Sequence, residues 1–347
     1  MAKAGSVFST GRTSGKLASG ELGVLRGIRA RAGRANGRVR LGIGDDCALL
    51  RLKSGDELAV TTDLSIEGRH FRLDWHTPES VGHRTLARGL SDLAAMGAEP
   101  VAAFLSLGLP ARLAGTRSGR ADEGVESRSW LDRFLDGLLG LAEANGVTLA
   151  GGDLAESPVA VADIVLTGAV ARGKALLRSG ARVGDGIYVT GVLGAAAAEL
   201  AALSAHPRRF ARVRNSGSGE FAHLFPVPRV AQGLRLRRAG LATAAIDISD
   251  GLSTELEHLC DESGVAAEIE ALRIPIGAGA TLEQALHGGE DYELLFTAGA
   301  GVPRRIEGVA VTRIGQVVAA RHGQAAVTLI AEGGREPLIA RGWEHFR

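Results

Sequence analysis

The sequence predicts an α/β protein of two domains, and three observations lead to this prediction. The chain has 347 residues, which is enough for two hydrophobic cores. Apolar runs of strand length alternate with longer stretches in which apolar residues recur at helical spacing. Glycine is abundant and proline scarce, with 49 and 10 residues respectively, as expected for a chain with many turns and close backbone approaches.

The chain contains seven apolar segments of strand length. They span residues 57–66, 161–170, 186–191, 244–249, 266–270, 292–299 and 309–318. The polar segment 171–186, which follows the second of them, joins two strand-rich halves. We therefore expect a loose N-terminal tail over 1–20, an N-terminal domain over 21–172 and a C-terminal α/β domain over 173–347.

Three longer segments carry apolar residues at helical spacing. In the segment 77–97, Thr77 is a suitable N-cap and Pro78 suits the first turn. The segment 130–146 ends on Asn-Gly, a helix-stopping pair. The segment 249–264 places four apolar side chains on one face, namely Leu252, Leu256, Leu259 and Cys260.

Composition excludes several classes of protein. A net charge of +1 gives no general attraction to nucleic acid or to an anionic membrane. No apolar run approaches the roughly 20 residues of a membrane span, and the first twenty residues lack the apolar core of a signal peptide. The only cysteines are Cys47 and Cys260, too few for a disulfide framework. We expect a cytoplasmic protein without nucleic-acid or membrane partners.

Aspartates recur beside glycines, hydroxyl residues and apolar strand ends. They are Asp45 and Asp46 in GIGDD, Asp63 after Thr61 and Thr62, Asp92 within a predicted helix, Asp153 after Gly151 and Gly152, and Asp247 and Asp250 in AIDISDGL. Each has an ordinary explanation when taken singly. Asp250 would cap the following helix, Asp92 would pair with Arg88 one turn earlier, and Asp153 would be a turn residue.

Taken together, the aspartates indicate a metal site. Strand ends at one edge of a sheet converge, and this edge is where α/β folds bind ligands. Converging carboxylates repel one another unless a cation neutralises them. Mg²⁺ prefers such oxygen ligands and commonly shares them with substrate phosphates, whereas the scarcity of cysteine disfavours zinc. The pattern predicts a site for several magnesium ions and a polyphosphate.

A standard phosphate-binding loop is absent from the sequence. The segment 168–175, GAVARGKA, has the spacing G-x-x-x-x-G-K, but Ala175 replaces the hydroxyl residue that would hold magnesium. The remaining candidates for holding phosphates are the metals, Arg178 and the helix N-terminus after Ser249. His70 in EGRHF and Glu290 in GGEDYELLF, taken singly, are ordinary polar residues beside strands.

The ordered series of motifs resembles the thiamine-monophosphate kinase family of aminoimidazole ribonucleotide synthetase-like enzymes. The motifs are GIGDDCALL, TTDLSIEGRHF, LSDLAAMGAEP, GGD, LLRSGARVGDGIYVTG, AIDISDGL and GGEDYELLF, and the resemblance covers nearly the whole chain after about residue 20. It implies two α/β domains and a homodimer whose N-terminal sheets pair into a barrel. It also implies transfer of the γ-phosphoryl group of ATP directly to thiamine monophosphate, the last step of thiamine diphosphate biosynthesis, with several Mg²⁺ ions.

The resemblance also assigns roles to residues by their positions in these motifs. Magnesium would be held by Asp46, Thr61, Thr62, Asp63, Asp92, Asp153, Asp247 and Asp250. ATP would contact Gly152, Asp153, Arg178 and Ser249. Thiamine monophosphate would contact His70, Glu290 and Trp343, the last in the terminal motif GWEHF. The residues expected to matter most for phosphoryl transfer are Asp46, Asp63 and Asp250.

Two departures from the family pattern stand out. Leu154 and Ala155 follow the GGD motif where relatives commonly carry small hydroxyl residues, which concerns the hydrogen bonds around Asp153 rather than Asp153 itself. The polar segment 111–129 is longer than in typical members, as expected for a surface insertion.

The reaction implied by the resemblance needs little proton transfer. The acceptor is an already ionised phosphate oxygen, so no general base is required, and the obstacle is the approach of two anions. Metal ions that bridge donor and acceptor oxygens would neutralise them.

The alternatives are another ATP-dependent enzyme of the superfamily, a non-catalytic Mg-nucleotide binding protein and a two-metal phosphohydrolase. A selenophosphate synthetase would need a cysteine or selenocysteine before residue 46, and a hydrogenase-maturation dehydratase would end in a cysteine. This chain has neither. Aminoimidazole ribonucleotide synthetase itself would show a different glycine motif in place of GIGDD.

Overall fold

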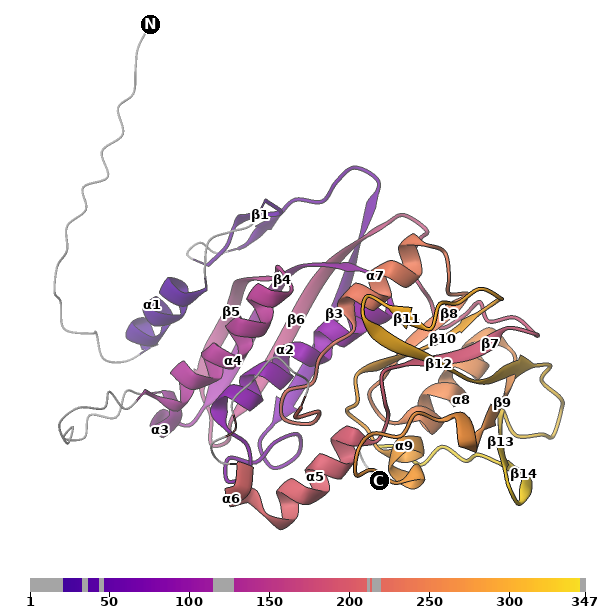
Figure 1. The fold of residues 1–347 in the computed structure, drawn as a ribbon. Coiled ribbons are helices and arrows are strands. Elements are labelled where there is room, and N and C mark those ends of the chain that lie inside the picture. The colour runs from indigo at the N-terminus through magenta and orange to yellow at the C-terminus, as the bar shows by residue number, and fades with distance from the viewer. Residues whose placement is uncertain are drawn as a thin grey trace, which may run out of the picture.

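The structure is a computed structural model that describes residues 21–32, 37–43, 47–114, 128–210, 213 and 220–343. Two sheets dominate this part of the chain, and helices pack against both (Figure 1). The four-stranded sheet has the order β3-β6-β4-β5, and the eight-stranded sheet has the order β14-β13-β9-β12-β7-β10-β8, with β11 paired to β12. No helix within the described ranges has the length and apolar character needed to cross a membrane.

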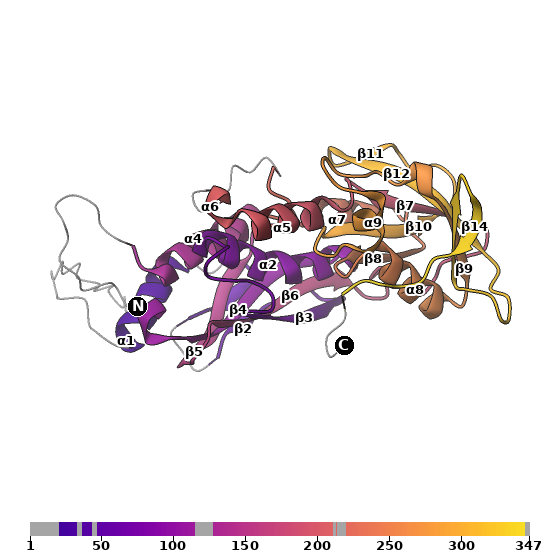
Figure 2. The same cartoon turned by 90° about the horizontal axis from the view of Figure 1, so that it is seen from below.

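The first half of the chain builds the four-stranded sheet and the helices on it. Its elements are α1 Glu21–Arg31, β1 Val39–Leu41, β2 Leu49–Leu50, β3 Asp56–Ile66, α2 Pro78–Ala95, β4 Glu99–Leu109, α3 Ala111–Ala114, α4 Trp130–Ala144, β5 Thr148–Glu156 and β6 Val161–Ala171. Figure 2 shows α2 and α4 on one face of this sheet. The buried side chains of α2 and α4 form one core with the inward-facing residues of β6.

The second half builds the eight-stranded sheet. Its elements are β7 Gly186–Thr190, α5 Ala195–Ala205, α6 Pro207–Phe210, α7 Val230–Arg238, β8 Ala244–Ile248, α8 Leu252–Ser263, β9 Ala266–Glu270, the 3₁₀-helix Ala271–Arg273, α9 Leu282–His287, β10 Glu293–Ala298, β11 Arg305–Ile306, β12 Val309–Val318, β13 Val327–Ala331 and β14 Gly334–Pro337. The helix α8 buries its Leu252, Leu256, Leu259 and Cys260 face, as predicted.

All seven predicted strands and all three predicted helices are present, with ends shifted by a few residues. The Thr77 hydroxyl oxygen accepts a hydrogen bond from the Ser80 amide at 3.3 Å, which confirms the predicted N-cap of α2. The elements that the prediction missed include β4, the central partner of β6, its neighbour β5, and the helix α5. The sequence of α5 is so rich in alanine that it has no contrast between an apolar and a polar face.

Convergence of strand ends does not describe two groups of predicted site residues. Thr61, Thr62 and Asp63 lie inside β3, because β3 pairs with β6 without interruption from Asp56 to Ile66. Asp153 likewise lies inside β5, paired with Ser106 of β4, rather than at a strand end. Polar residues are tolerated there because β3 and β5 are the two edge strands of the sheet.

The two faces of the four-stranded sheet differ. Thr61 and Asp63 point toward α2, whereas the alternation of a strand places Thr62 on the opposite face. On that opposite face Leu58, Val60 and Leu64 are 47%, 57% and 46% exposed. An edge strand with three exposed large apolar side chains in alternating positions is unusual for a sheet that faces water.

Candidate active site

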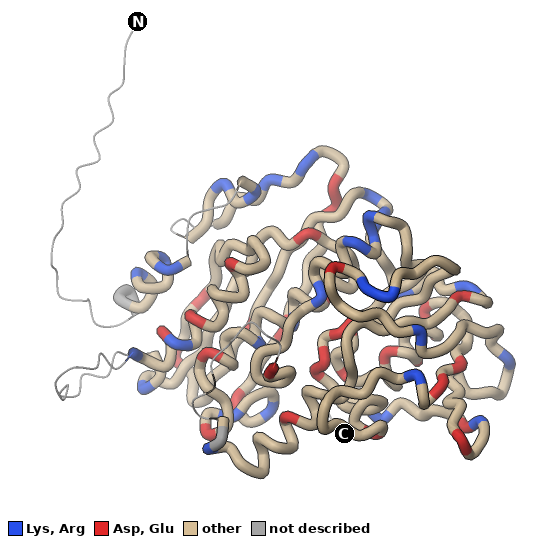
Figure 3. Tube along the Cα trace, in the orientation of Figure 1, with Lys and Arg blue, Asp and Glu red and all other residues tan. Residues whose placement is uncertain are grey.

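A cavity of about 960 Å³ lies where the two halves of the chain meet. Acidic residues gather in this central region of the trace (Figure 3). Residues from β3, α2 and the segment after β3 form one wall, and residues from β8, α8, the segment before β10 and the C-terminal segment form the other. Eight of the predicted site residues line it: Asp63, His70, Asp92, Asp247, Ser249, Asp250, Glu290 and Trp343.

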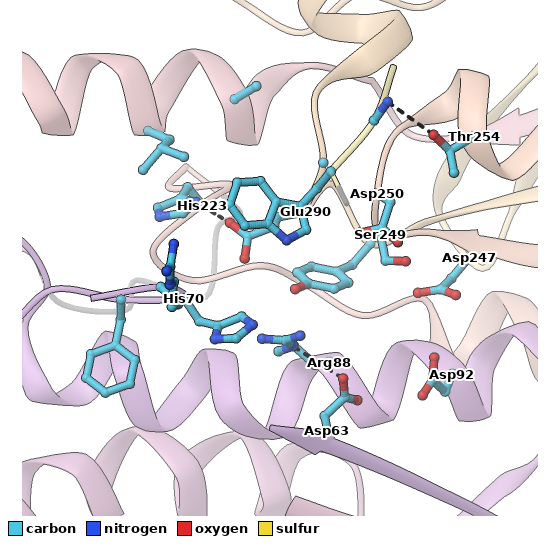
Figure 4. A pocket seen from close by; sticks show the side chains of 18 of the residues that line it. Asp63, His70, Arg88, Asp92, His223, Asp247, Ser249, Asp250, Thr254 and Glu290 are labelled. Atoms are coloured by element: carbon cyan, nitrogen blue, oxygen red, sulfur yellow. Dashed lines mark hydrogen bonds and ion pairs between the residues drawn. The ribbon is translucent and has the colours of Figure 1, made fainter. Parts of the chain in front are cut away.

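One end of the cavity is acidic (Figure 4). Asp92 of α2 accepts a hydrogen bond from the Thr61 hydroxyl of β3. Asp247 of β8 accepts one from the Ser91 hydroxyl at 2.7 Å. Neighbouring residues of α2 therefore form hydrogen bonds to β3 on one side and to β8 on the other, and this arrangement brings β3 and β8 to the same place.

The predicted pairing of Asp92 with Arg88 is wrong. The Arg88 Nε atom instead lies 3.4 Å from the Asp63 carboxylate, so the arginine reaches across to β3 rather than along its own helix. Asp63 Oδ2 and Arg88 Nη1 are buried and have no hydrogen-bond partner among the described residues. Each therefore retains a polar atom that a bound group can satisfy.

Electrostatics at the acidic end favour a cation. Burial raises the pKa of Asp63 to about 7, against the opposing charge of Arg88 and with a further contribution from Asp92. Burial, then the nearby Asp92 charge, also raises the pKa of Asp247 well above its usual range. These carboxylates are costly to ionise together unless a positive charge joins them, so the donor set fits a hard divalent cation. The described residues contain no cluster of three His, Cys, Asp or Glu side chains ready to hold a metal. A cation here would need further oxygen ligands, as Mg²⁺ bound to phosphates has.

Asp250 lies in the turn between β8 and α8. The helix begins at Leu252 after Gly251, so Gly251 occupies the N-cap position and Asp250 is not the helix cap. The Glu255 carboxylate accepts hydrogen bonds from the Ser249 hydroxyl at 3.3 Å and from the Asp250 amide at 3.1 Å. This holds the turn while the Asp250 side chain faces the cavity (Figure 4).

The opposite end of the cavity carries a buried charge network around Glu290. Its carboxylate accepts a hydrogen bond from Arg84 at 2.5 Å and contacts His223 at 3.0 Å. Burial alone would raise the pKa of Glu290, but Arg84 and His223 reverse this and lower it below its usual range. Trp343 is half exposed at the cavity, and its amide donates to the Asp250 carbonyl at 3.2 Å, which anchors the C-terminal segment there.

Sequence reasoning missed several residues of this site. Arg84 was not singled out, and Arg88 was named only as a partner of Asp92, although both precede Asp92 at a spacing of four residues on a helix that is largely buried. That spacing puts all three on one helix face and is a signal that a closer reading would have used. No local pattern marks His223, which reaches the cavity only through the tertiary fold.

Some predicted residues lie away from the cavity. Thr62 and Asp153 lie on the outer face of the four-stranded sheet, and Gly152 lies beside Asp153 in β5. Arg178 is exposed after β6 and does not line the cavity, although its charge lowers the pKa of Asp92 against the larger effect of burial. Asp46 falls outside the described residues, as do the 1–20 tail and most of the 111–129 segment.

Residues 44–172 match the family model described as AIR synthase related protein, N-terminal domain. The first part of the chain, with the four-stranded sheet, is therefore similar to the N-terminal domain of AIR synthase-related proteins. Over 344 residues the chain is 38% identical to thiamine-monophosphate kinase of Escherichia coli K12, covering 95% of this chain and 99% of the relative. The chain belongs to the thiamine-monophosphate kinase family, which confirms the resemblance seen in its motifs.

Solved structures agree with this assignment. The crystal structure of thiamine-monophosphate kinase from Stenotrophomonas maltophilia K279a is 36% identical, has a TM-score of 0.72, and the match covers 88% of this chain and 94% of that one. A structure described as AaThiL complexed with AMPPCP and TMP is 28% identical, with a TM-score of 0.68 and coverage of 94% and 97%. The α/β fold predicted from the sequence is therefore shared with these relatives.

Proposed function

We propose that this chain transfers the γ-phosphoryl group of ATP to the phosphate of thiamine monophosphate, giving thiamine diphosphate and ADP. One observation carries the proposal: acidic side chains from both halves of the chain meet at one end of a cavity whose other end holds an ionised glutamate and an exposed indole. Family membership supports the same reaction, and the AaThiL structure has been solved with AMPPCP and TMP.

The residues that fit magnesium in this cavity are Asp63, Asp92, Asp247 and Asp250, with Thr61 hydrogen-bonded to Asp92. Bound Mg²⁺ would supply positive charge that lets two phosphate groups approach. The unpartnered Asp63 Oδ2 atom, together with the raised pKa values of Asp63 and Asp247, supports this role.

The other residues of the cavity orient the two substrates. Ser249 lies beside the N-terminus of α8, where backbone amides favour a phosphate of ATP. Glu290, His70 and Trp343 would hold the thiamine end of the acceptor, leaving its phosphate directed to the acidic end. The acceptor oxygen is already ionised, so transfer proceeds in line without a general base or a covalent intermediate.

An assay with ATP, Mg²⁺ and thiamine monophosphate tests the function. We expect thiamine diphosphate and ADP in equal amounts, and no diphosphate when EDTA removes the metal. ADP and inorganic phosphate without the diphosphate would indicate a phosphohydrolase instead. Nucleotide binding without turnover would indicate a Mg-nucleotide sensor.

We further propose a homodimer formed through the outer face of the four-stranded sheet. The strand register places Leu64, Asp163, Ser106 and Asp153 in one row on this face, and Thr62 lies on it beside the exposed Val60. Pairing this face with a second subunit would cover the exposed apolar side chains of β3. It would also place Thr62 and Asp153, two predicted magnesium ligands, at a subunit boundary.

A charge on this face is expected to separate the subunits. The substitution Val60→Asp puts a carboxylate in the centre of the proposed interface, where burying it is costly. Sedimentation should show a dimer for the wild type and a monomer for Val60→Asp. The control Leu272→Asp, at a side chain 84% exposed in the 3₁₀-helix of the other half, should stay dimeric. A wild-type monomer at micromolar concentration would contradict the proposal.

The cytoplasm, which supplies ATP, is the compartment we propose for this enzyme. We also propose the domain boundary near residue 172. The four-stranded sheet uses only residues before this point, and the eight-stranded sheet uses only residues from 186 onward.

A further inference from the structure

Two buried side chains contact the Glu290 carboxylate on the side away from the cavity. Arg84 Nη2 donates to Glu290 Oε1 at 2.5 Å, and His223 Nδ1 lies 3.0 Å from Glu290 Oε2. Arg84 and His223 are only 4% and 2% exposed, whereas the Glu290 side chain is 26% exposed and lines the cavity. One side of the carboxylate is therefore bound by protein, and the other side is offered to a ligand (Figure 4).

The contact between His223 and Glu290 indicates the protonation pattern of the two histidines. A carboxylate only accepts, so His223 must carry its proton on Nδ1 to donate to Glu290. Its Nε2 atom then accepts, and it lies 3.0 Å from His76 Nε2, which must be the donor. The remaining His76 nitrogen, Nδ1, accepts from the Arg72 amide at 3.2 Å. With both rings neutral, this line of hydrogen bonds satisfies every ring nitrogen.

The neighbouring charge agrees with neutral rings. Arg84 Nη1 lies 2.8 and 3.0 Å from the two ring nitrogens of His223 and donates to its carbonyl oxygen at 2.7 Å. Burial, followed by this guanidinium charge, lowers the pKa of His223, and burial lowers that of His76 to about 3. Arg84 thus supplies the positive charge that donates directly to the Glu290 carboxylate, and Arg88 adds a further favourable charge without a direct hydrogen bond.

The backbone around the network is anchored from two further sides. The Glu199 carboxylate of α5 accepts from the amides of His223 and Leu224 at 3.0 and 3.2 Å. Asp291, next to Glu290, accepts from the amides of Gly194 and Ala196 at the start of α5 at 2.6 and 3.1 Å. The helix α5 thereby ties the His223 segment to the segment that carries Glu290.

Glu290 itself has a φ of 68°, the left-handed region that a non-glycine residue rarely adopts. Its amide donates to the Ser249 carbonyl at 2.7 Å, which fixes this conformation. An unfavourable backbone conformation held by so many contacts indicates that the direction of the side chain matters.

We propose that Arg84 and His223 are positioning residues that hold Glu290 as an anion directed into the cavity. Glu290 in turn selects an acceptor with a cationic or hydrogen-donating heteroaromatic end. The proposal rests on the proposed function, in which the thiamine end of the acceptor lies against Glu290. Arg84 and His223 act through Glu290 and do not touch the phosphates.

A double-mutant cycle tests this chain of action. Glu290→Gln and Arg84→Met should each raise the KM for thiamine monophosphate by about tenfold to a hundredfold, the range for a lost hydrogen bond to a charged group, while the KM for ATP stays within about twofold. Arg84→Met should add little in the Glu290→Gln background, because Glu290 is its charged partner and its other contact toward the cavity is a 3.1 Å hydrogen bond to the His70 carbonyl oxygen. Arg84→Lys should restore part of the affinity. The proposal would be overturned if the effects of the two substitutions on the KM for thiamine monophosphate multiplied in the double variant. An equal rise in the KM for ATP would overturn it as well.

A matched control and a second variant guard against a general loss of structure. His83 is buried next to Arg84 and donates to the Pro226 carbonyl at 2.7 Å, on a side away from Glu290. His83→Asn should lower thermal stability without changing the KM for thiamine monophosphate. If Arg84→Met does not fold, His223→Gln takes its place in the cycle.

A ligand-free readout separates this proposal from the proposed function. Nitrogen NMR of the imidazoles should show His223 as the Nδ1–H form, with a shift in Glu290→Gln and loss of the signal in His223→Gln. An Nε2–H form of His223 would overturn the proposal even if the enzyme makes thiamine diphosphate. A protein that shows the Nδ1–H form but neither binds nor phosphorylates thiamine monophosphate would reject the proposed function. The positioning of Glu290 by Arg84 and His223 would still stand.

Discussion

Replacing Asp63 or Asp250 by Asn is expected to lower the turnover number by at least about a thousandfold with the fold intact. Both side chains face the cavity from different halves of the chain, Asp63 from β3 and Asp250 from the turn before α8. An amide keeps their shape and removes the negative charge that would hold magnesium. Steady-state production of thiamine diphosphate at saturating Mg²⁺ measures the effect, and turnover near the wild-type level in both variants would contradict the proposed roles.

The same change at Asp63 is expected to stabilise the metal-free protein. Folding raises the pKa of Asp63 from 3.8 to about 7, so the ionised carboxylate destabilises the fold at neutral pH. In EDTA, Asp63→Asn should be more stable than the wild type by about 1–3 kcal/mol at pH 8.

The sign of the pH dependence follows from the raised pKa. Between pH 7 and 4 the folded wild type takes up the proton and the destabilisation disappears, so the advantage of Asp63→Asn should shrink as the pH falls through this range. Denaturant unfolding at pH 8 and pH 5 measures the difference. The control Asp261→Asn, at an exposed position on α8, should change neither activity nor stability. Equal stabilities of Asp63→Asn and the wild type at both pH values would contradict this account.

Gain of stability with loss of activity is a pattern that a purely structural carboxylate would not produce. Asp63 and Asp247 are placed where their charge is unfavourable in the absence of a cation. We propose that such an arrangement is retained because the charge is used in binding.

The sequence allowed the aspartates to be found but not their arrangement. Motif order identified Asp63, Asp92, Asp247 and Asp250, and the structure brings all four to one cavity. The reason first given, convergence of strand ends, holds for β8 but not for β3, where Asp63 lies within the strand and reaches the site because α2 crosses that face.

Tertiary contacts explain what the sequence could not predict. His223 comes to Glu290 through packing between segments 67 residues apart, and no local spacing encodes such a contact. The side of the sheet on which Asp153 lies depends on the register of β4 and β5, and a shift by one residue would turn it to the other face. The existence of seven strands followed from composition, whereas β4, β5 and the register did not.

The substitution Gly82→Ala is expected to destabilise the protein by about 3 kcal/mol, although alanine is the better helix former. A Cβ atom at Gly82 of α2 would overlap the backbone carbonyl of Phe134 on α4, and one at Gly137 of α4 would overlap the carbonyl of Glu79 on α2. These two glycines let the helices touch backbone to backbone, and backbone atoms cannot move aside as a flexible side chain can.

The consequence extends to the cavity because α2 carries Arg84, Arg88 and Asp92. Forcing α2 away from α4 would displace these side chains relative to the site residues of β3 and β8. Gly82→Ala should therefore also lower kcat/KM by about tenfold or more. Gly140→Ala is the matched control on α4, where a Cβ meets nothing within 4 Å, and it should raise stability by about 0.5–1 kcal/mol without changing activity. Chemical denaturation of both variants measures the contrast. If Gly82→Ala proved as stable as Gly140→Ala, close packing of α2 on α4 would not be what positions the site.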